Sequence, residues 1–297
     1  MGGLENLHAP MCAATKDVFA VVEQHDQLPH QFTILEPADS AWLETLAAVY
    51  RDLRTVTDSP LIDLTLNGVQ ILDVASVKAR LTSTQLPTRN ASPRGTNFAV
   101  ERSDLGEVAM ALAGEQLRGY AYGYRSTRDR ELVSLPGRGI DQIGIRSDFD
   151  SALEEHITLS LGEAKVSSQA RNPPGVVDSA GDSMRNQHLG HISAVSATCA
   201  KLWGASRRCT DPEIQRLLQL AATLWEHKQF EYLVVKCTNM LVRPVHGSEA
   251  DFGSFATSPN DFAPGEIDFM VLRIDTGDVE VVVDQFLQSA RGTGGKQ

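Results

Sequence analysis

The segment Ile157–Lys165, ITLSLGEAK, constrains the fold more than any other part of this sequence. Alternate side chains of a strand point to the same face. If this segment is a strand, the first three residues of one face are aliphatic and the last two are Glu163 and Lys165. Charges beside an aliphatic core are costly unless they have a partner or a chemical task. A divalent cation held by carboxylates next to a lysine is one such task, and it indicates metal-assisted attack on a phosphodiester.

Asp141 is a second acid on an otherwise aliphatic strand face. It lies in the segment Gly139–Arg146, GIDQIGIR, and would share its face with two isoleucines. We expect this segment to pair with Ile157–Lys165 as an antiparallel neighbour, which places Asp141 beside Glu163. The acidic loop between them, 148–155, follows no strand alternation and is expected to stay solvated. Two adjacent carboxylates raise each other's pKa unless a cation lies between them. Mg²⁺, or Mn²⁺ in its place, would resolve that conflict.

A helical acid completes the candidate site. The sequence predicts a strand over 96–102 and then a helix beginning near Ser103 or Asp104, with Glu107 in its first turns. Glu107 can hold the metal or its water shell, or it can serve only the helix dipole. Lys165 can orient the attacking water or offset charge in the transition state. The candidate catalytic residues are Glu107, Asp141, Glu163 and Lys165, and the candidate metal ligands are Glu107, Asp141, Glu163 and the carbonyl of Ala164.

This arrangement resembles the PD-(D/E)xK nuclease superfamily, in which a helix bearing Glu precedes an acid on one strand and an ExK pair on the next. Asp141 matches the first acid, Glu163 and Lys165 match the ExK pair, and Glu107 matches the helical acid. Ile140 stands where the superfamily name has Pro. The resemblance implies an α/β fold with a restriction-endonuclease-like mixed sheet flanked by helices, and Mg²⁺-dependent hydrolysis of DNA.

The finer resemblance is to the nuclease subunits of Hachiman anti-phage defence systems, the HamA family. It rests on SDLGEVAMAL, GIDQIGI and LGEAK in this order, and it extends from about Asn97 to the C-terminal helix. It implies a deoxyribonuclease that acts with a helicase subunit, HamB, which restrains it and delivers DNA to it.

Composition agrees with a nuclease that borrows DNA affinity from a partner. The 297 residues carry a net charge of -11, which argues against a surface that grips phosphates throughout. The four cysteines, Cys12, Cys199, Cys209 and Cys237, lack metal-binding spacing, and Cys199 and Cys237 are expected to be buried thiols. No stretch approaches the roughly 18 apolar residues of a membrane helix. We therefore expect a reduced, cytoplasmic protein with no membrane partner.

The chain is expected to contain two domains, joined by a linker over 83–95, STQLPTRNASPRG. Residues 1–90 would form a regulatory or partner-docking module, and residues 91–297 the nuclease-like domain. For the first domain we predict strands at 18–24, 31–36 and 61–67 and helices at 38–56 and 69–81. Beyond Lys165 we predict helices at 184–203, 212–227 and 279–291 and strands at 231–245 and 269–275.

Other candidate residues have alternative interpretations. The stretch Arg118–Arg138 contains five arginines and Tyr120, Tyr122 and Tyr124, and it would either track phosphates or form a solvated hairpin. Gln169 would approach the scissile phosphate or lie in a solvated loop. His188 and His191 would face the cleft or belong to an ordinary amphipathic helix.

Two further functions fit the same pattern. One is a restriction or repair endonuclease acting alone, although no segment is devoted to reading bases. The other is a non-catalytic adaptor subunit that regulates a helicase. The complete set of four residues in the candidate site argues against a vestigial site.

Overall fold

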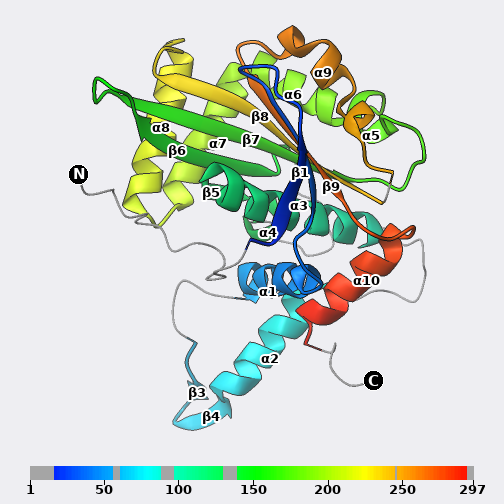
Figure 1. Ribbon diagram of the computed structural model, residues 1–297. Coiled ribbons are helices and arrows are strands. Elements are labelled where there is room, and N and C mark those ends of the chain that lie inside the picture. Colours follow the sequence, from blue (N-terminus) through cyan, green and yellow to red (C-terminus); the bar gives the residue numbers. More distant parts are fainter. Residues whose placement is uncertain (1–16, 56–60, 88–96, 130–138, 245, 293–297) are drawn as a thin grey trace.

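The computed structural model describes residues 17–55, 61–87, 97–129, 139–244 and 246–292 (Figure 1). Within these residues, a seven-stranded mixed sheet has the order β1-β2-β9-β8-β7-β6-β5. Its middle strands β2, β9, β8 and β7 are parallel, and β1, β6 and β5 each run antiparallel to the neighbour that they pair with. The strands are β1 (Phe19–Gln24), β2 (Gln31–Pro37), β5 (Ala121–Arg125), β6 (Gln142–Phe149), β7 (Glu155–Val166), β8 (Leu233–Arg243) and β9 (Glu266–Arg273).

Helices cover both faces of the sheet, which confirms the predicted mixed α/β fold (Figure 1). One face packs against α3 (Asn97–Arg118), with α1 (Trp42–Thr55) and α10 (Val279–Ala290) beyond it. The other face is covered by α6 (Met184–Ser193), α7 (Val195–Arg208) and α8 (Pro212–Glu226). Short elements complete the two layers: α4 (Ser126–Asp129) lies beside α1 and α3, and α5 (Gly175–Asp178), α9 (Ser254–Thr257) and the 3₁₀ turns η1 (Glu249–Phe252) and η2 (Pro259–Phe262) lie on the side of α6.

The side chains of β7 alternate between the two faces of the sheet, as its sequence predicts. Ile157, Leu159 and Leu161 lie in the apolar cluster beneath α7 and α8, whereas Ala164 packs on the opposite face with α3. Gly106 of α3 lies so close that a Cβ there would be 3.3 Å from the Cβ of Ala164. The helix therefore approaches the end of β7 directly, which brings the candidate site residues into one region.

Helices α8 and α10 form where the sequence predicts them, because each has strong local signals. Asp211 caps α8 by accepting hydrogen bonds from the main-chain N–H groups of Glu213 and Ile214, and Pro212 occupies the first turn. Asp278 caps α10 in the same way. Both helices bury one apolar face against the sheet.

Three predicted elements are wrong. The segment 96–102 was expected to be a strand, but α3 begins at Asn97, and Asp104 is an interior helical residue whose carboxylate accepts a 2.7 Å hydrogen bond from the Tyr50 hydroxyl. The helix predicted over 184–203 is divided at Ala194, where ψ is 54°. The helix predicted over 69–81 is replaced by β4 (Val69–Leu72) and α2 (Val74–Gln85), whereas β3 (Leu64–Leu66) lies within the predicted strand 61–67.

The last of these corrections has a local cause. Asn67 and Gly68 both have positive φ, at 51° and 77°, which turns β3 back into β4. Asp73 then caps α2 by accepting a 2.7 Å hydrogen bond from the N–H of Ser76. We call residues 61–85, which comprise β3, β4 and α2, the arm. It projects from the body of the molecule (Figure 1).

In the described part of the first ninety residues, β1 and β2 belong to the seven-stranded sheet that contains β7, whereas β3 and β4 pair as a separate two-stranded sheet. Phe32, Ile34 and Leu35 of β2 are fully buried in the common core. Helix α2 runs into the predicted linker as far as Gln85, and residues 88–96 of that linker lie outside the described residues. The regulatory task assigned to residues 1–90 stays a prediction. No helix in the described ranges is long and apolar enough to cross a bilayer.

Candidate active site

Asp141 and Glu163 meet where β6 begins beside the end of β7. The last register pair is Gln142 with Gly162, and the Asp141 carboxylate then accepts a 2.9 Å hydrogen bond from the N–H of Ala164. The Asp141 carboxylate thus accepts the hydrogen bond from this N–H in place of a main-chain carbonyl of the neighbouring strand. Both main-chain groups of a strand residue point toward the same neighbouring strand, so the Ala164 carbonyl also points to the Asp141 side. The structure thus brings together three of the predicted metal ligands: Asp141, Glu163 and Ala164.

The two carboxyl groups are strongly coupled. Burial raises the pKa of Glu163 to about 8; the nearby Lys165 opposes this rise and Glu107 adds to it. Asp141 keeps some accessible surface, but desolvation and the Glu163 charge raise the pKa of its carboxyl well above the usual range. The two groups also hydrogen-bond to each other. Without a cation they cannot both be ionised at low cost.

Glu107 is buried nearby but is already hydrogen-bonded. Its Oε1 accepts a 2.9 Å bond from the Ser103 hydroxyl, and its Oε2 accepts from the hydroxyls of Ser126 and Thr127 at the start of α4. Burial, followed by the charges of Asp141 and Asp104, raises the pKa of Glu107 to about 8. The oxygens of Glu107 thus accept hydrogen bonds from three hydroxyl groups, and Glu107 and Asp141 each make ionisation of the other less favourable.

Lys165 reaches from the strand end toward solvent. Its side chain is 23% exposed, and its Nζ lies 3.7 Å from a carboxylate oxygen of Asp182, which is itself 77% exposed. A pair this open is weak and is easily exchanged for a phosphate. Lys165 is thus placed to meet an incoming anion beside the Asp141–Glu163 pair.

Two histidines of α6 belong to the same region. The Nε2 of His191 lies 2.9 Å from Oε1 of Glu163, and the Nε2 of His188 lies 3.1 Å from Oδ1 of Asn239. Burial lowers the pKa of His191 to about 4 and that of His188 to about 3, so both rings are neutral. His191 thus contacts a candidate site residue, whereas His188 contacts Asn239 on the neighbouring strand.

The sequence left two interpretations of His191 open and gave no indication of Lys201. Met184, His188 and His191 are the buried residues of α6, and their i, i+4, i+7 spacing was the available signal for a buried helical face. Lys201 lies on α7, where its positive charge acts on both Glu163 and His191. Its ammonium lies against Gly139, where an added Cβ would be 2.1 Å from Nζ. Nothing in the local sequence connects Lys201 with β7.

Two arginines of the arginine-rich stretch are held in ion pairs within the protein. Arg118 forms a 3.0 Å ion pair with the buried Asp268, and Arg125 forms a 3.0 Å ion pair with Glu115. Tyr120 and Tyr122 are buried, and Arg208 lies over the ring of Tyr124. Arg130 and Arg138 lie outside the described residues. Arg118 and Arg125 therefore stabilise the fold and are not free to contact phosphates.

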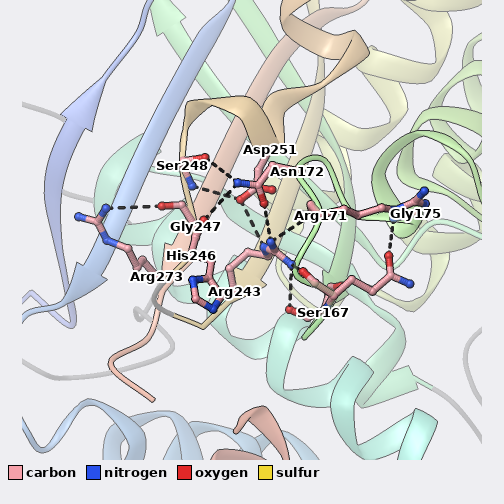
Figure 2. Close-up of polar contacts among 11 residues, drawn as sticks. Ser167, Arg171, Asn172, Gly175, Arg243, His246, Gly247, Ser248, Asp251 and Arg273 are labelled. Carbon is pink, nitrogen blue, oxygen red and sulfur yellow. Dashed lines mark hydrogen bonds and ion pairs between the residues drawn. The ribbon is translucent and has the colours of Figure 1, made fainter. Parts of the chain in front are cut away.

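The loop that follows β7 is anchored by Arg243 (Figure 2). This fully buried side chain donates to the main-chain oxygens of Ser167, Gln169 and Arg171, and also to Asn172 and Asp251. Gln169 uses its own Oε1 to accept a 2.7 Å bond from the N–H of Gly175. The loop is thus held in one conformation next to Lys165.

The predicted inert thiols are buried. Burial raises the pKa of Cys199 to about 11 and that of Cys237 to about 12, which keeps both protonated. A thiol in this state is not a nucleophile.

A different acidic cluster has three possible metal-ligand atoms close to one another. Ligand atoms of Asp150, Glu154 and His156 all lie within 4.8 Å of one another, and no other group of three in the described ranges does so. This cluster lies at the turn between β6 and β7, in the acidic loop that was expected to be solvated, and both acids are exposed. The Asp141–Glu163 pair offers two carboxylates instead, which is the number Mg²⁺ commonly takes from a protein.

No known protein family, curated protein or solved structure matched this chain when it was compared with them. The interpretation of the site therefore rests on its own geometry.

Proposed function

We propose that this protein is a metal-dependent DNA endonuclease, the effector of an anti-phage defence system, acting with a helicase subunit that restrains it. The observation that carries the proposal is the pairing of Asp141 with Glu163 at the end of β7, with Lys165 two residues further on. The order of elements supports it as well. Helix α3 with Glu107 precedes β6 and β7, as in the PD-(D/E)xK nucleases and their restriction-endonuclease-like sheet.

The donor set fits Mg²⁺ or Mn²⁺. Asp141 and Glu163, with the Ala164 carbonyl, would hold the ion, since hard cations prefer oxygen ligands and a cation removes the repulsion between the two carboxylates. Such a cation polarises a phosphate oxygen and lowers the pKa of bound water. Glu107 lies near enough to add negative charge around this water shell.

Lys165 has a separate task in the proposed reaction. Its ammonium can leave the exposed Asp182 and contact the phosphate, orienting the attacking water and offsetting the charge that develops in the transition state. Lys201 adds a second positive charge on the same side. The two lysines favour an anionic substrate at a site that otherwise consists of acids.

The charge of the chain is consistent with the proposed helicase partner, which the family resemblance implies. A net charge of -11 opposes the approach of DNA, and two arginines of the most basic stretch are held in internal ion pairs. A subunit that binds DNA and feeds it to the site would remove this difficulty.

Plasmid degradation in Mg²⁺ tests the proposal, with each protein assayed alone and with a helicase partner. Glu163→Ala and Lys165→Ala should each lower the cleavage rate by about a hundredfold or more. Glu154→Ala is the matched control, because it removes an exposed carboxylate from the other acidic cluster and should cleave normally. Unchanged cleavage in both site variants would refute the site. Absence of cleavage in every form, with helicase activity still regulated, would favour the adaptor.

A further inference from the structure

Glu163 has a close partner that metal binding alone does not explain. His191 extends from α6 so that its Nε2 lies 2.9 Å from Glu163 Oε1, and the two side chains are only 9% and 2% exposed. When Glu163 is ionised, as a metal ligand is, its carboxylate can only accept a hydrogen bond, so Nε2 of His191 then carries the hydrogen and donates it. The contact is thus a buried, directed hydrogen bond to one oxygen of the carboxylate.

The helix that carries His191 is fixed over the sheet at two adjacent points. Glu163 of β7 and Asn239 of β8 are register neighbours, and His191 contacts the first while His188, one turn earlier, contacts the second. The main-chain oxygen of His191 also accepts a 2.8 Å bond from the Thr198 hydroxyl of α7. His191 therefore has little freedom to move away from Glu163.

We propose that His191 is a positioning residue of the metal site, which holds the Glu163 carboxylate in the orientation that binds the cation together with Asp141. This inference rests on the proposed function, since it takes Glu163 as a metal ligand. One oxygen of Glu163 is bound to the imidazole, and the carboxyl group also contacts Asp141, so the hydrogen bond prevents rotation of the carboxylate away from its partner. Partners of this kind typically change metal affinity by about 10- to 100-fold.

The same geometry distinguishes positioning from direct coordination. A ring nitrogen that carries a hydrogen has no lone pair for a metal, so His191 does not itself bind the ion. Loss of the histidine should then weaken Mg²⁺ and Mn²⁺ binding equally. A ligand histidine would instead favour Mn²⁺, because imidazole suits softer cations than Mg²⁺.

The experiment compares His191→Gln with His191→Met in the full-length chain. The two replacements are similar in size, but only the glutamine amide can donate to Glu163. Calorimetric titration with Mg²⁺ and with Mn²⁺ should show wild-type affinity, within about threefold, for His191→Gln and binding about 10- to 100-fold weaker for His191→Met. His188→Met is the matched control, because it alters the same helix face without contacting Glu163, and its metal affinity should stay within about threefold of wild type.

Several outcomes would overturn the inference: wild-type affinity in His191→Met, equal losses in His191→Met and His188→Met, or a selective loss of Mn²⁺ binding. If His191→Met does not fold, ¹⁵N NMR of the histidines in the wild-type chain decides. An Nε2 of His191 that stays protonated in saturating Mg²⁺ supports positioning, and a deprotonated Nε2 overturns it. A wild-type chain that binds neither metal would contradict the proposed function instead.

Discussion

The sheet and the arm depart from the usual distribution of side chains in opposite directions. The sheet and the helix α3 that covers it bury ionisable groups, including Glu107 of α3 and Glu163, Arg243 and Asp268 of the sheet. The arm exposes aliphatic side chains, such as Ile62 at 67% and Leu66 at 64%, and α2 has no buried residue. Both arrangements are costly, one through desolvation of charge and the other through hydration of apolar surface.

The difference lies in where each group finds its partners. Arg243 has five acceptors and Glu107 has three hydroxyl donors, all within this chain. The aliphatic side chains of the arm have no comparable cover from the described residues. Buried charges that are satisfied internally stabilise one conformation, whereas an exposed apolar surface adds little to the stability of the monomer.

Replacement of Arg243 should have the largest effect on stability. Arg243→Met leaves Asp251 buried without its cation and removes the anchor of the loop after β7, so the free energy of unfolding in urea should fall by about 3–5 kcal/mol. Arg273→Met is the matched control. Arg273 pairs in register with Arg243, but its side chain is 26% exposed and its partner Glu36 is 42% exposed, so its loss should cost less than about 1 kcal/mol. Equal losses would remove the distinction between buried and exposed charge.

The pH dependence of metal stabilisation should be the next largest effect. Glu163 has its pKa raised from 4.5 to about 8, so without metal the stability contributed by its neutral form is present below pH 4.5 and is lost as the pH rises through 8. A cation binds the ionised pair, so the rise in Tm with Mg²⁺ relative to EDTA should grow from near zero at about pH 5 to about 5 °C at about pH 9.

Glu163→Gln provides the control for this measurement. The amide is neutral at every pH, so this variant should show a smaller loss of Tm with rising pH in EDTA and a smaller Mg²⁺ effect. A Mg²⁺ effect in wild type that is independent of pH would contradict the assignment of the metal to the Asp141–Glu163 pair.

The arm should show the smallest effect. Leu66→Thr and Ile71→Thr replace side chains that are 64% and 59% exposed, so thermal unfolding should report changes within about 0.5 kcal/mol. Leu161→Ala, in the core beneath α7, is the comparison and should cost about 2–5 kcal/mol. A large destabilisation by the arm substitutions would show that these side chains are covered in solution, and the contrast with the sheet would disappear.

The sequence alone determined the elements whose signals are local. The aliphatic alternation of 157–161 predicted β7, and the sequence also predicted α8 and α10, whose segments carry their own capping residues and apolar face. It also placed Asp141 and Glu163 on adjacent strands, because a short hairpin connection leaves few other pairings. These features depend on residues close together in the chain, where period and capping chemistry decide the outcome.

Only the tertiary structure decided which distant groups meet. Asp104 inside α3 meets Tyr50 of α1, Arg118 pairs with Asp268 of β9, and Glu163 of β7 meets His191 of α6. Periodicity shows which face of an element a residue occupies, but it does not show which other element covers that face. That choice comes from packing the whole sheet at once, since each buried charge must find its partner among segments far away in the sequence.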